Sequence, residues 1–137
     1  MAEVNPIAEA NPVDSVLVSA VVYLLGDESV PAAAETVAQR VTVRADGTVA
    51  VILGSFTVET NDNTERQNRL ASALGELWAT FVGAGFWPSH TAKQVDVVLS
   101  ISLSPAWGQA GISISPESLQ QWLEAGAYLH VNAYSQM

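Results

Sequence analysis

The sequence contains no cysteine, which excludes disulfide bonds, thiolate metal sites and cysteine nucleophiles. It also lacks a long apolar run: the longest, Val16 to Leu25, is half of the roughly 20 residues that a membrane-spanning helix needs. The N-terminus carries Glu3 and Glu9 with no early lysine or arginine, unlike a secretory signal. These absences predict a cytoplasmic protein that does not contact membranes.

Basic residues are scarce: five lysines and arginines stand against fourteen acidic residues, so the formal net charge is −9. A field of this sign repels phosphates and anionic lipids, and direct nucleic-acid binding is not expected. The charge fits attraction to a basic protein partner, or simply the solubility of an apolar chain. Because the acids are spread along the sequence, with Asp27–Glu28 the only adjacent pair, solubility is the simpler explanation.

What is abundant is apolar side chains, at 49% of 137 residues, which favours a folded domain over a disordered chain. Residues 1–13 contain two Asn-Pro steps and no hydrophobic periodicity, so they are predicted to form an N-terminal arm. Residues 14–137 are predicted to form a single α+β domain.

Strands and helices alternate along this domain. The predicted order is a strand at 15–25, a helix within 26–41, a hairpin at 41–59, a helix within 61–85, a strand at 94–104, a helix from Ser115 to Gly126 and a strand at 127–134. The first six elements follow the β-α-β-β-α-β order of the ferredoxin-like fold, and an αβ unit is added at the C-terminus. This order predicts a mainly antiparallel sheet with helices on one face.

Local signals refine this prediction. Asp46-Gly47 predicts a type I′ turn in the hairpin, and Gly54 a bulge in its second arm. Thr64 with Gln67 has capping-box spacing for the long helix, and Gly75 inside that helix predicts a close backbone contact. The polar side of the same helix, with Arg66 and Arg69, is expected to face water.

The segment Gly111 to Tyr134 combines Gly-Ile-x-Ile-Ser-Pro-Glu-x-Leu, a helix closing on Ala-Gly, and a strand ending in tyrosine. Over Val95 to Tyr134 the chain resembles the bacterial family named domain of unknown function 4279. The resemblance implies a small stand-alone bacterial domain with no assigned activity, of the kind found beside toxins as immunity factors. No catalytic residue is implied by it.

Motifs for catalysis are weak. Ser89, His90 and Asp96 could form a triad on paper, but no Gly-x-Ser-x-Gly elbow accompanies them. His90 and His130 do not occur in a metal-ligand spacing, and no glycine-rich loop opens a helix to hold a phosphate. We therefore expect neither an enzyme, nor a cofactor, nor a metal site.

The strand patterns indicate a sheet that is apolar on both faces. One face is expected to lie under the helices, with Val16, Val18, Val49, Val51, Val97, Leu99 and Val131. The other presents Leu17, Val21, Tyr23, Ala50, Ile52, Val98, Tyr128, His130, Asn132 and Tyr134. Since apolar patches of this extent usually mark an interface, the arm, a second copy in a homodimer, or a different protein is expected to cover it.

The function expected from these features is protein binding, most concretely by a small acidic inhibitor or immunity-type protein that neutralises a basic partner. The candidate partner-binding residues are Tyr23, Trp87, Trp107, Tyr128, His130, Asn132 and Tyr134. One alternative is a phage or mobile-element protein that blocks a defence complex by mimicking nucleic acid. Another is a small hydrolase or ligand-binding enzyme that uses His90 or His130.

Overall fold

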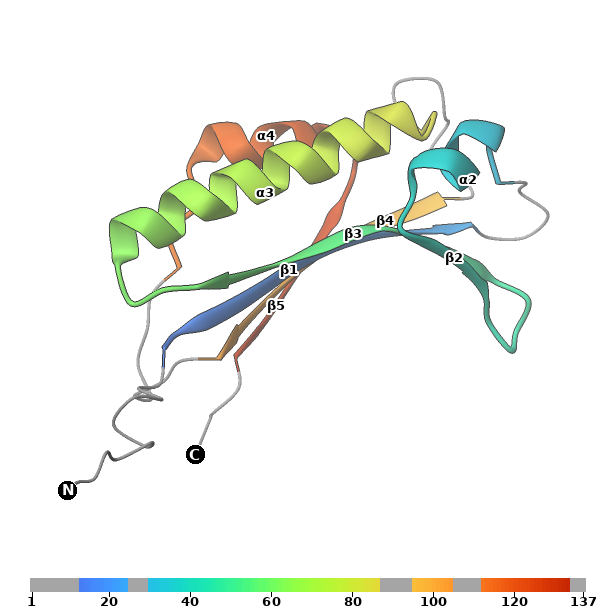
Figure 1. The fold of residues 1–137 in the computed structure, drawn as a ribbon. Coiled ribbons are helices and arrows are strands. Elements are labelled where there is room, and N and C mark those ends of the chain that lie inside the picture. The colour runs from blue at the N-terminus through green and yellow to red at the C-terminus, as the bar shows by residue number, and fades with distance from the viewer. Residues whose placement is uncertain (1–12, 25–29, 87–94, 105–111, 134–137) are drawn as a thin grey trace.

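The computed structural model describes residues 13–24, 30–86, 95–104 and 112–133. Within them the protein is an α+β fold, with one five-stranded mixed sheet and three helices (Figure 1). The predicted N-terminal arm lies outside the described residues except for Val13.

Strand β1 (Ser15–Leu24) lies at the centre of the sheet, whose order is β2-β3-β1-β4-β5. It runs antiparallel to both neighbours, β3 (Val49–Glu59) and β4 (Val95–Ser104). The short β2 (Arg40–Val43) is antiparallel to β3, whereas β5 (Tyr128–Ala133) is parallel to β4. Three of the four strand pairs are therefore antiparallel, as predicted.

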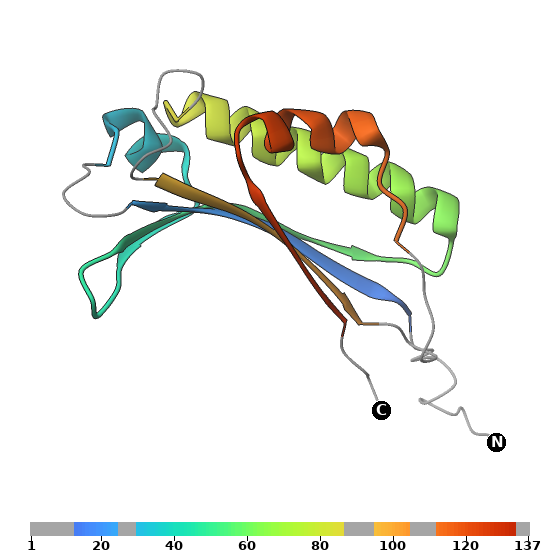
Figure 2. The ribbon, with the colours of Figure 1, turned by 180° about the vertical axis from the view of Figure 1, so that it is seen from behind.

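The helices α2 (Ala32–Val37), α3 (Asn63–Gly83) and α4 (Pro116–Glu124) all lie on the same side of the sheet (Figures 1 and 2). Helix α3 crosses the central strands, and α4 lies beside it on the side of β5. The prediction that one face of the sheet carries the helices is confirmed, and no described element covers the opposite face.

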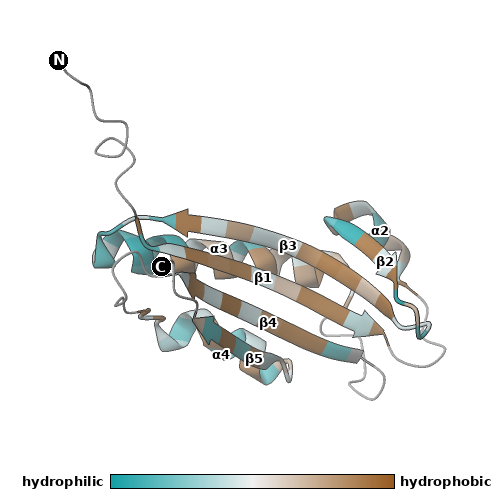
Figure 3. Ribbon diagram, turned by 90° about the horizontal axis from the view of Figure 1, so that it is seen from below, coloured by the Kyte–Doolittle hydropathy of each residue, from teal (hydrophilic) through white to brown (hydrophobic). Residues whose placement is uncertain are grey.

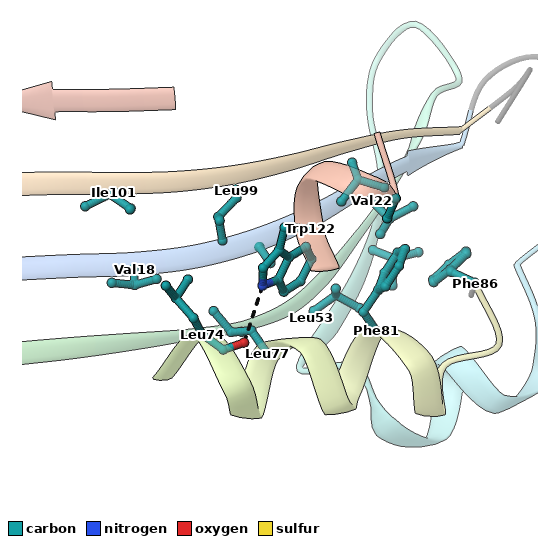
Figure 4. Packing of buried hydrophobic residues seen from close by; sticks show 14 of the residues in the cluster. Val18, Val22, Leu53, Leu74, Leu77, Phe81, Phe86, Leu99, Ile101 and Trp122 are labelled. Atoms are coloured by element: carbon teal, nitrogen blue, oxygen red, sulfur yellow. Dashed lines mark hydrogen bonds between the residues drawn. The ribbon is translucent and has the colours of Figure 1, made fainter. Parts of the chain in front are cut away.

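The core fills the space between β1 and α3. Alternate β1 residues, from Val16 to Leu24, are buried, and they meet Leu70, Leu74 and Phe81 of α3. Trp122 of α4 enters this layer, where its ring lies 5.2 Å from Trp78 and its indole N–H donates to the Leu74 carbonyl oxygen at 3.4 Å (Figure 4). One tryptophan therefore joins α4 to α3 and to the core above the sheet.

The hairpin is confirmed, with a different turn from the one predicted. Arg44 and Thr48 are joined by an amide-to-carbonyl hydrogen bond of 2.8 Å, so the loop has three residues, and only its last, Gly47, is a glycine at positive φ (89°). Such a loop combines a tight turn with a glycine bulge. The Thr48 amide donates to the Asp46 carboxylate, which lowers the pKa of Asp46 below its ordinary value.

Two capping and packing predictions for α3 are wrong. The N-cap is Asp62, whose carboxylate accepts from the Glu65 amide at 2.8 Å, and not Thr64. Gly75 is exposed and has no atom within 4 Å of the position a Cβ would take. The close approach occurs instead at Gly54, where the pairing with β1 shifts by one residue and a Cβ would stand 3.2 Å from Leu77 Cδ2.

Alanine at these two glycines should have opposite effects. Gly75→Ala should raise the free energy of unfolding by up to about 1 kcal/mol, because alanine is the better helix former and meets no obstacle. Gly54→Ala should lower it by about 1 kcal/mol, because the new methyl group overpacks against the buried Leu77. Urea denaturation of both variants measures the difference, and equal effects would contradict this account of the bulge.

The expectation that Arg66 faces water is also wrong. Its side chain is 1% exposed, and Nη2 donates to Asp14 Oδ2 at 2.7 Å and to the Thr60 carbonyl oxygen at 2.8 Å. A buried guanidinium requires such partners, because burial without them costs several kcal/mol. The pair joins the start of β1 to the first turn of α3, 52 residues further on.

Removing one partner of this pair should be costly. Asp14→Ala should lower the free energy of unfolding by about 3–5 kcal/mol, because it leaves a buried charge unpaired. The double variant Asp14→Ala, Arg66→Leu should recover most of that loss. Arg69→Ala, which breaks an exposed pair with Glu65 at 3.7 Å, is the control and should cost less than about 1 kcal/mol. A double variant no more stable than Asp14→Ala would contradict the explanation.

Candidate functional site: the open face of the sheet

The side of the sheet opposite the helices is named here the open face (Figure 3). Strand alternation and register put nine of the ten residues predicted for this side on it. They are Leu17, Val21, Tyr23, Ala50, Ile52, Val98, Tyr128, His130 and Asn132. The tenth, Tyr134, lies outside the described residues.

An apolar row crosses four strands of the open face. Ile52 pairs with Val21, Val21 with Val98, and Val98 with Tyr128. The three aliphatic residues are half-buried, and Tyr128 at the end of the row is 63% exposed. Because each side chain is beside the next, the row is a continuous apolar strip and not a set of isolated residues.

The next rows are more polar than the sequence suggested. Ser19 faces Ser55 on one side and Ser100 on the other, and Ser100 pairs with His130. Leu17, 44% exposed, stands one row further along. The open face therefore consists of an apolar row, a row of hydroxyl groups and an isolated exposed leucine. The expectation of an almost wholly apolar face needs this correction.

The helix side of the molecule and the open face differ in net charge. The exposed side chains of the helices include five glutamates, and among the described basic residues on helices only Arg69 is exposed. These glutamates are Glu35, Glu65, Glu76, Glu117 and Glu124. The open face carries Arg40 and Arg44 against Glu59 and Asp96, so its charges balance.

The two arginines of the β2 hairpin are a part of the site that residue types alone did not reveal. Arg40 pairs with Ile52, and the guanidinium of Arg44 lies 5.4 Å from the centre of the Tyr23 ring. This is a cation–π distance, and it holds Arg44 over the open face. The available signal was the two-residue spacing Arg40-x-Thr42-x-Arg44, which puts all three side chains on one side of a strand.

Four of the seven residues predicted to bind a partner therefore share the open face: Tyr23, Tyr128, His130 and Asn132. Tyr128 and His130 are exposed, while Tyr23 and Asn132 are half-buried. The remaining three, Trp87, Trp107 and Tyr134, lie outside the described residues.

The described residues offer little that could catalyse a reaction. His130 is exposed on an edge strand, and its pairing neighbour Ser100 forms no hydrogen bond with it in the part of the chain described. His90 and Ser89 lie outside that part. No group of three His, Asp or Glu side chains that could hold a metal ion is found among the described residues.

Two shallow hollows lie away from the open face or at its edge. One, of about 450 Å³, runs along α4 and is lined by Pro116, Leu119, Gln120, Leu123 and Glu124. The other, of about 230 Å³, lies between β3 and α3 beside Arg69. Neither contains a histidine or a pair of adjacent carboxylates that would suggest a reaction.

In comparisons with known proteins, no family model, curated protein or solved structure matches the chain. The resemblance of Val95 to Tyr134 to domain of unknown function 4279 stays a prediction. Across the described segments, no helix has both the length and the apolar character needed to span a membrane.

Alanine substitutions at two neighbouring residues of β1 test whether one face of the sheet is buried and the other is exposed to solvent. Val18→Ala should lower the free energy of unfolding by about 2–3 kcal/mol, because Val18 is fully buried under α3. Leu17→Ala should change it by less than about 1 kcal/mol, because this side chain is already largely in water. Denaturant titration of both variants gives the comparison. Equal losses would mean that the open face is covered.

Proposed function

We propose that this protein is a non-enzymatic domain that binds another protein through the open face of its sheet. The observation that carries the proposal is that all described helices lie on one side of the sheet (Figures 1 and 3), while the central strand β1 has apolar residues on both of its faces. An antiparallel sheet that faces only water usually carries polar side chains there. The apolar row and the exposed Leu17 depart from that rule.

The composition of the open face fits a protein partner. One row is apolar and ends at Tyr128, Tyr23 stands in the next row along β1, and Arg40 and Arg44 lie at one edge. Tyrosine and arginine are enriched at interfaces, because each provides a large contact area together with polar groups. The hydroxyl row adds hydrogen-bonding groups directly beside the apolar row.

The charge of the chain favours a basic partner. A net charge of −9 produces a long-range field that speeds the approach of a basic protein, and the glutamates on the helices contribute to it. Because the open face itself is balanced, binding there does not bury a cluster of like charges. We propose a cytoplasmic inhibitor of the immunity-protein type, which neutralises the protein that it binds.

Mimicry of nucleic acid receives less support. Glu65 and Glu76 lie on one side of α3, but eleven residues of helix separate them by about 16 Å. Phosphates along one DNA strand follow one another at about 3.4 Å of helix rise. An enzyme that uses His130 would need a second group to orient the imidazole, and the open face presents no carboxylate beside it.

We also propose that the first four strands with α2 and α3 form a ferredoxin-like unit, to which α4 and β5 are added. The order β2-β3-β1-β4, with β1 antiparallel to both neighbours, supports this assignment. The same architecture occurs with many functions, so the fold does not choose among them.

Site-specific photo-cross-linking in the cells that make the protein tests the proposal. A benzoylphenylalanine at position 17 on the open face should cross-link to one heterologous protein, whereas the same group in place of Asn68, exposed on α3, should not. With the cross-linked protein purified, its association rate should fall steeply as salt is added, because steering is screened.

Two results would contradict the proposal. Cross-linking of the chain to itself from position 17 would mean that a homodimer covers the open face. Equal cross-linking from positions 17 and 68 would mean that the open face has no special role.

A further inference from the structure

The outer edge of β5 is the most open of the sheet's edges. Within the described residues, the three longest stretches with no strand neighbour on one side are β2, the second half of β3, and β5. An unpaired edge exposes backbone N–H and C=O groups, and proteins normally protect it with charge, shortness or bulges. The three stretches differ in how they are protected.

Strand β2 is four residues long and has Arg40 at its start and Arg44 directly after its end. The free half of β3 begins at the bulge at Gly54 and ends at Glu59, where the Arg69 guanidinium lies 3.5 Å from the Glu59 carbonyl oxygen. Strand β5, Tyr-Leu-His-Val-Asn-Ala, has no lysine, arginine, acid or proline and no bulge. It has none of the protections of the other two.

Apolar side chains gather on the helix side of β5. Leu129 and Val131 pair with the buried Leu99 and Ile101 and therefore point toward the helix layer, where the sequence analysis predicted Val131 to be covered. They are nevertheless 44% and 57% exposed. The helix layer does not extend far enough to cover the sheet's last strand.

Helix α4 continues this exposed surface. Trp122 points toward α3, and Leu123, about 100° further around the helix, is 58% exposed on the side away from α3. That side carries the hollow of about 450 Å³, and α4 as a whole lies toward the β5 edge of the sheet (Figure 2). Leu123, Leu129 and Val131 are named here the β5 edge patch.

We propose that the β5 edge patch binds a second copy of this chain, by antiparallel pairing of β5 with β5. Two molecules that each carry a charge of −9 repel one another, so they associate best where no acid is brought together. Strand β5 meets this condition. Pairing β2 with itself would bring arginines together and pairing the free half of β3 would bring Glu59 together, so β5 is the edge at which self-association meets the least repulsion between like charges.

A twofold axis perpendicular to the sheet, midway between the His130 residues of the two copies, gives a self-complementary register. Leu129 of one copy then lies opposite Val131 of the other, and Tyr128 lies opposite Asn132. The exposed apolar residues of each β5 cover those of the other. On the helix side each copy adds the hollow along α4, which is lined by Leu119 and Leu123 and has the carboxylate of Glu124 at its end, so the contact expected there is smaller than the one between the strands.

This dimer keeps the proposed partner site exposed, although Tyr128, His130 and Asn132 of β5 belong to the open face as well as to the paired strand. A perpendicular axis keeps the helices of both copies on one side, so the two sheets join into one with both open faces on the other side. The dimer therefore leaves the open face free and would present it twice. Its existence does not depend on the proposed function.

Disulfide trapping tests the edge and the register, because the chain has no cysteine of its own. His130→Cys should give a covalent dimer under mild oxidation, since opposed residues of paired antiparallel strands stand within disulfide reach. Val43→Cys, on β2 and 72% exposed, is the matched control and should form no covalent dimer. Equal trapping of both variants, or of neither, would overturn the proposed register.

Sedimentation equilibrium of the full chain tests the dimer without a cross-link. The unmodified protein and Val43→Lys should sediment at twice the chain mass, and Val131→Lys at the mass of one chain. Circular dichroism and thermal unfolding establish that Val131→Lys is folded. Hydrogen exchange tests the dimer without a variant. In the unmodified protein, the β5 amides should exchange more slowly as the protein concentration rises.

The remaining outcomes overturn the proposal. A monomer at millimolar concentration would exclude the dimer. Loss of the dimer on Leu17→Lys but not on Val131→Lys would assign it to the open face and would contradict the proposed function as well. Loss on Val43→Lys would assign it to the β2 edge.

Discussion

Burial of one side of β1 beneath α3 is the constraint on which the rest of the structure depends. With a strand on either side and a helix above, β1 has every second residue removed from water, and its alternation leaves Leu17, Val21 and Tyr23 on the other side. The small pair Ala20 and Gly54 lets Leu77 approach the sheet. The open face is therefore a geometric consequence of how the core is built.

The surfaces of the protein differ in charge in a way that suits different contacts. The helices present glutamates to solvent, the open face balances two arginines against two acids, and β5 is uncharged. In the proposed function and the proposed dimer, the helices supply long-range attraction, the open face contacts the partner and the β5 edge pairs with a second copy. Because the open face stays exposed beside the paired strands, a dimer and a partner complex could form together.

Much of this arrangement could be predicted from the sequence, because it depends on local periodicity. The two-residue alternation of β1 and β4, the turn at Asp46-Gly47 and the long apolar stripe of α3 all indicated their elements. The same alternation predicted which residues lie on the open face, among them Tyr23, Tyr128, His130 and Asn132.

What could not be predicted depends on residues distant in sequence. Arg66 occurs on the polar side of α3, and only its meeting with Asp14, 52 residues earlier, explains its burial. Leu129 and Val131 follow a core pattern, yet they are exposed because the helix layer stops short of β5. The hydroxyl row needs three strands in register before it exists. The register between strands and the extent of the helix layer over the sheet are tertiary properties, and the hydrophobic periodicity of the sequence does not determine them.

Carbene footprinting of the intact free chain, read residue by residue by mass spectrometry, tests the central claim most directly. It reports which side chains meet solvent in the whole protein, including any contact made by residues 1–12. The account predicts strong labelling of Leu17 and Tyr128 and almost none of Val16 and Val18. Labelling of Leu17 as weak as that of Val18, at concentrations where the chain is monomeric, would contradict it.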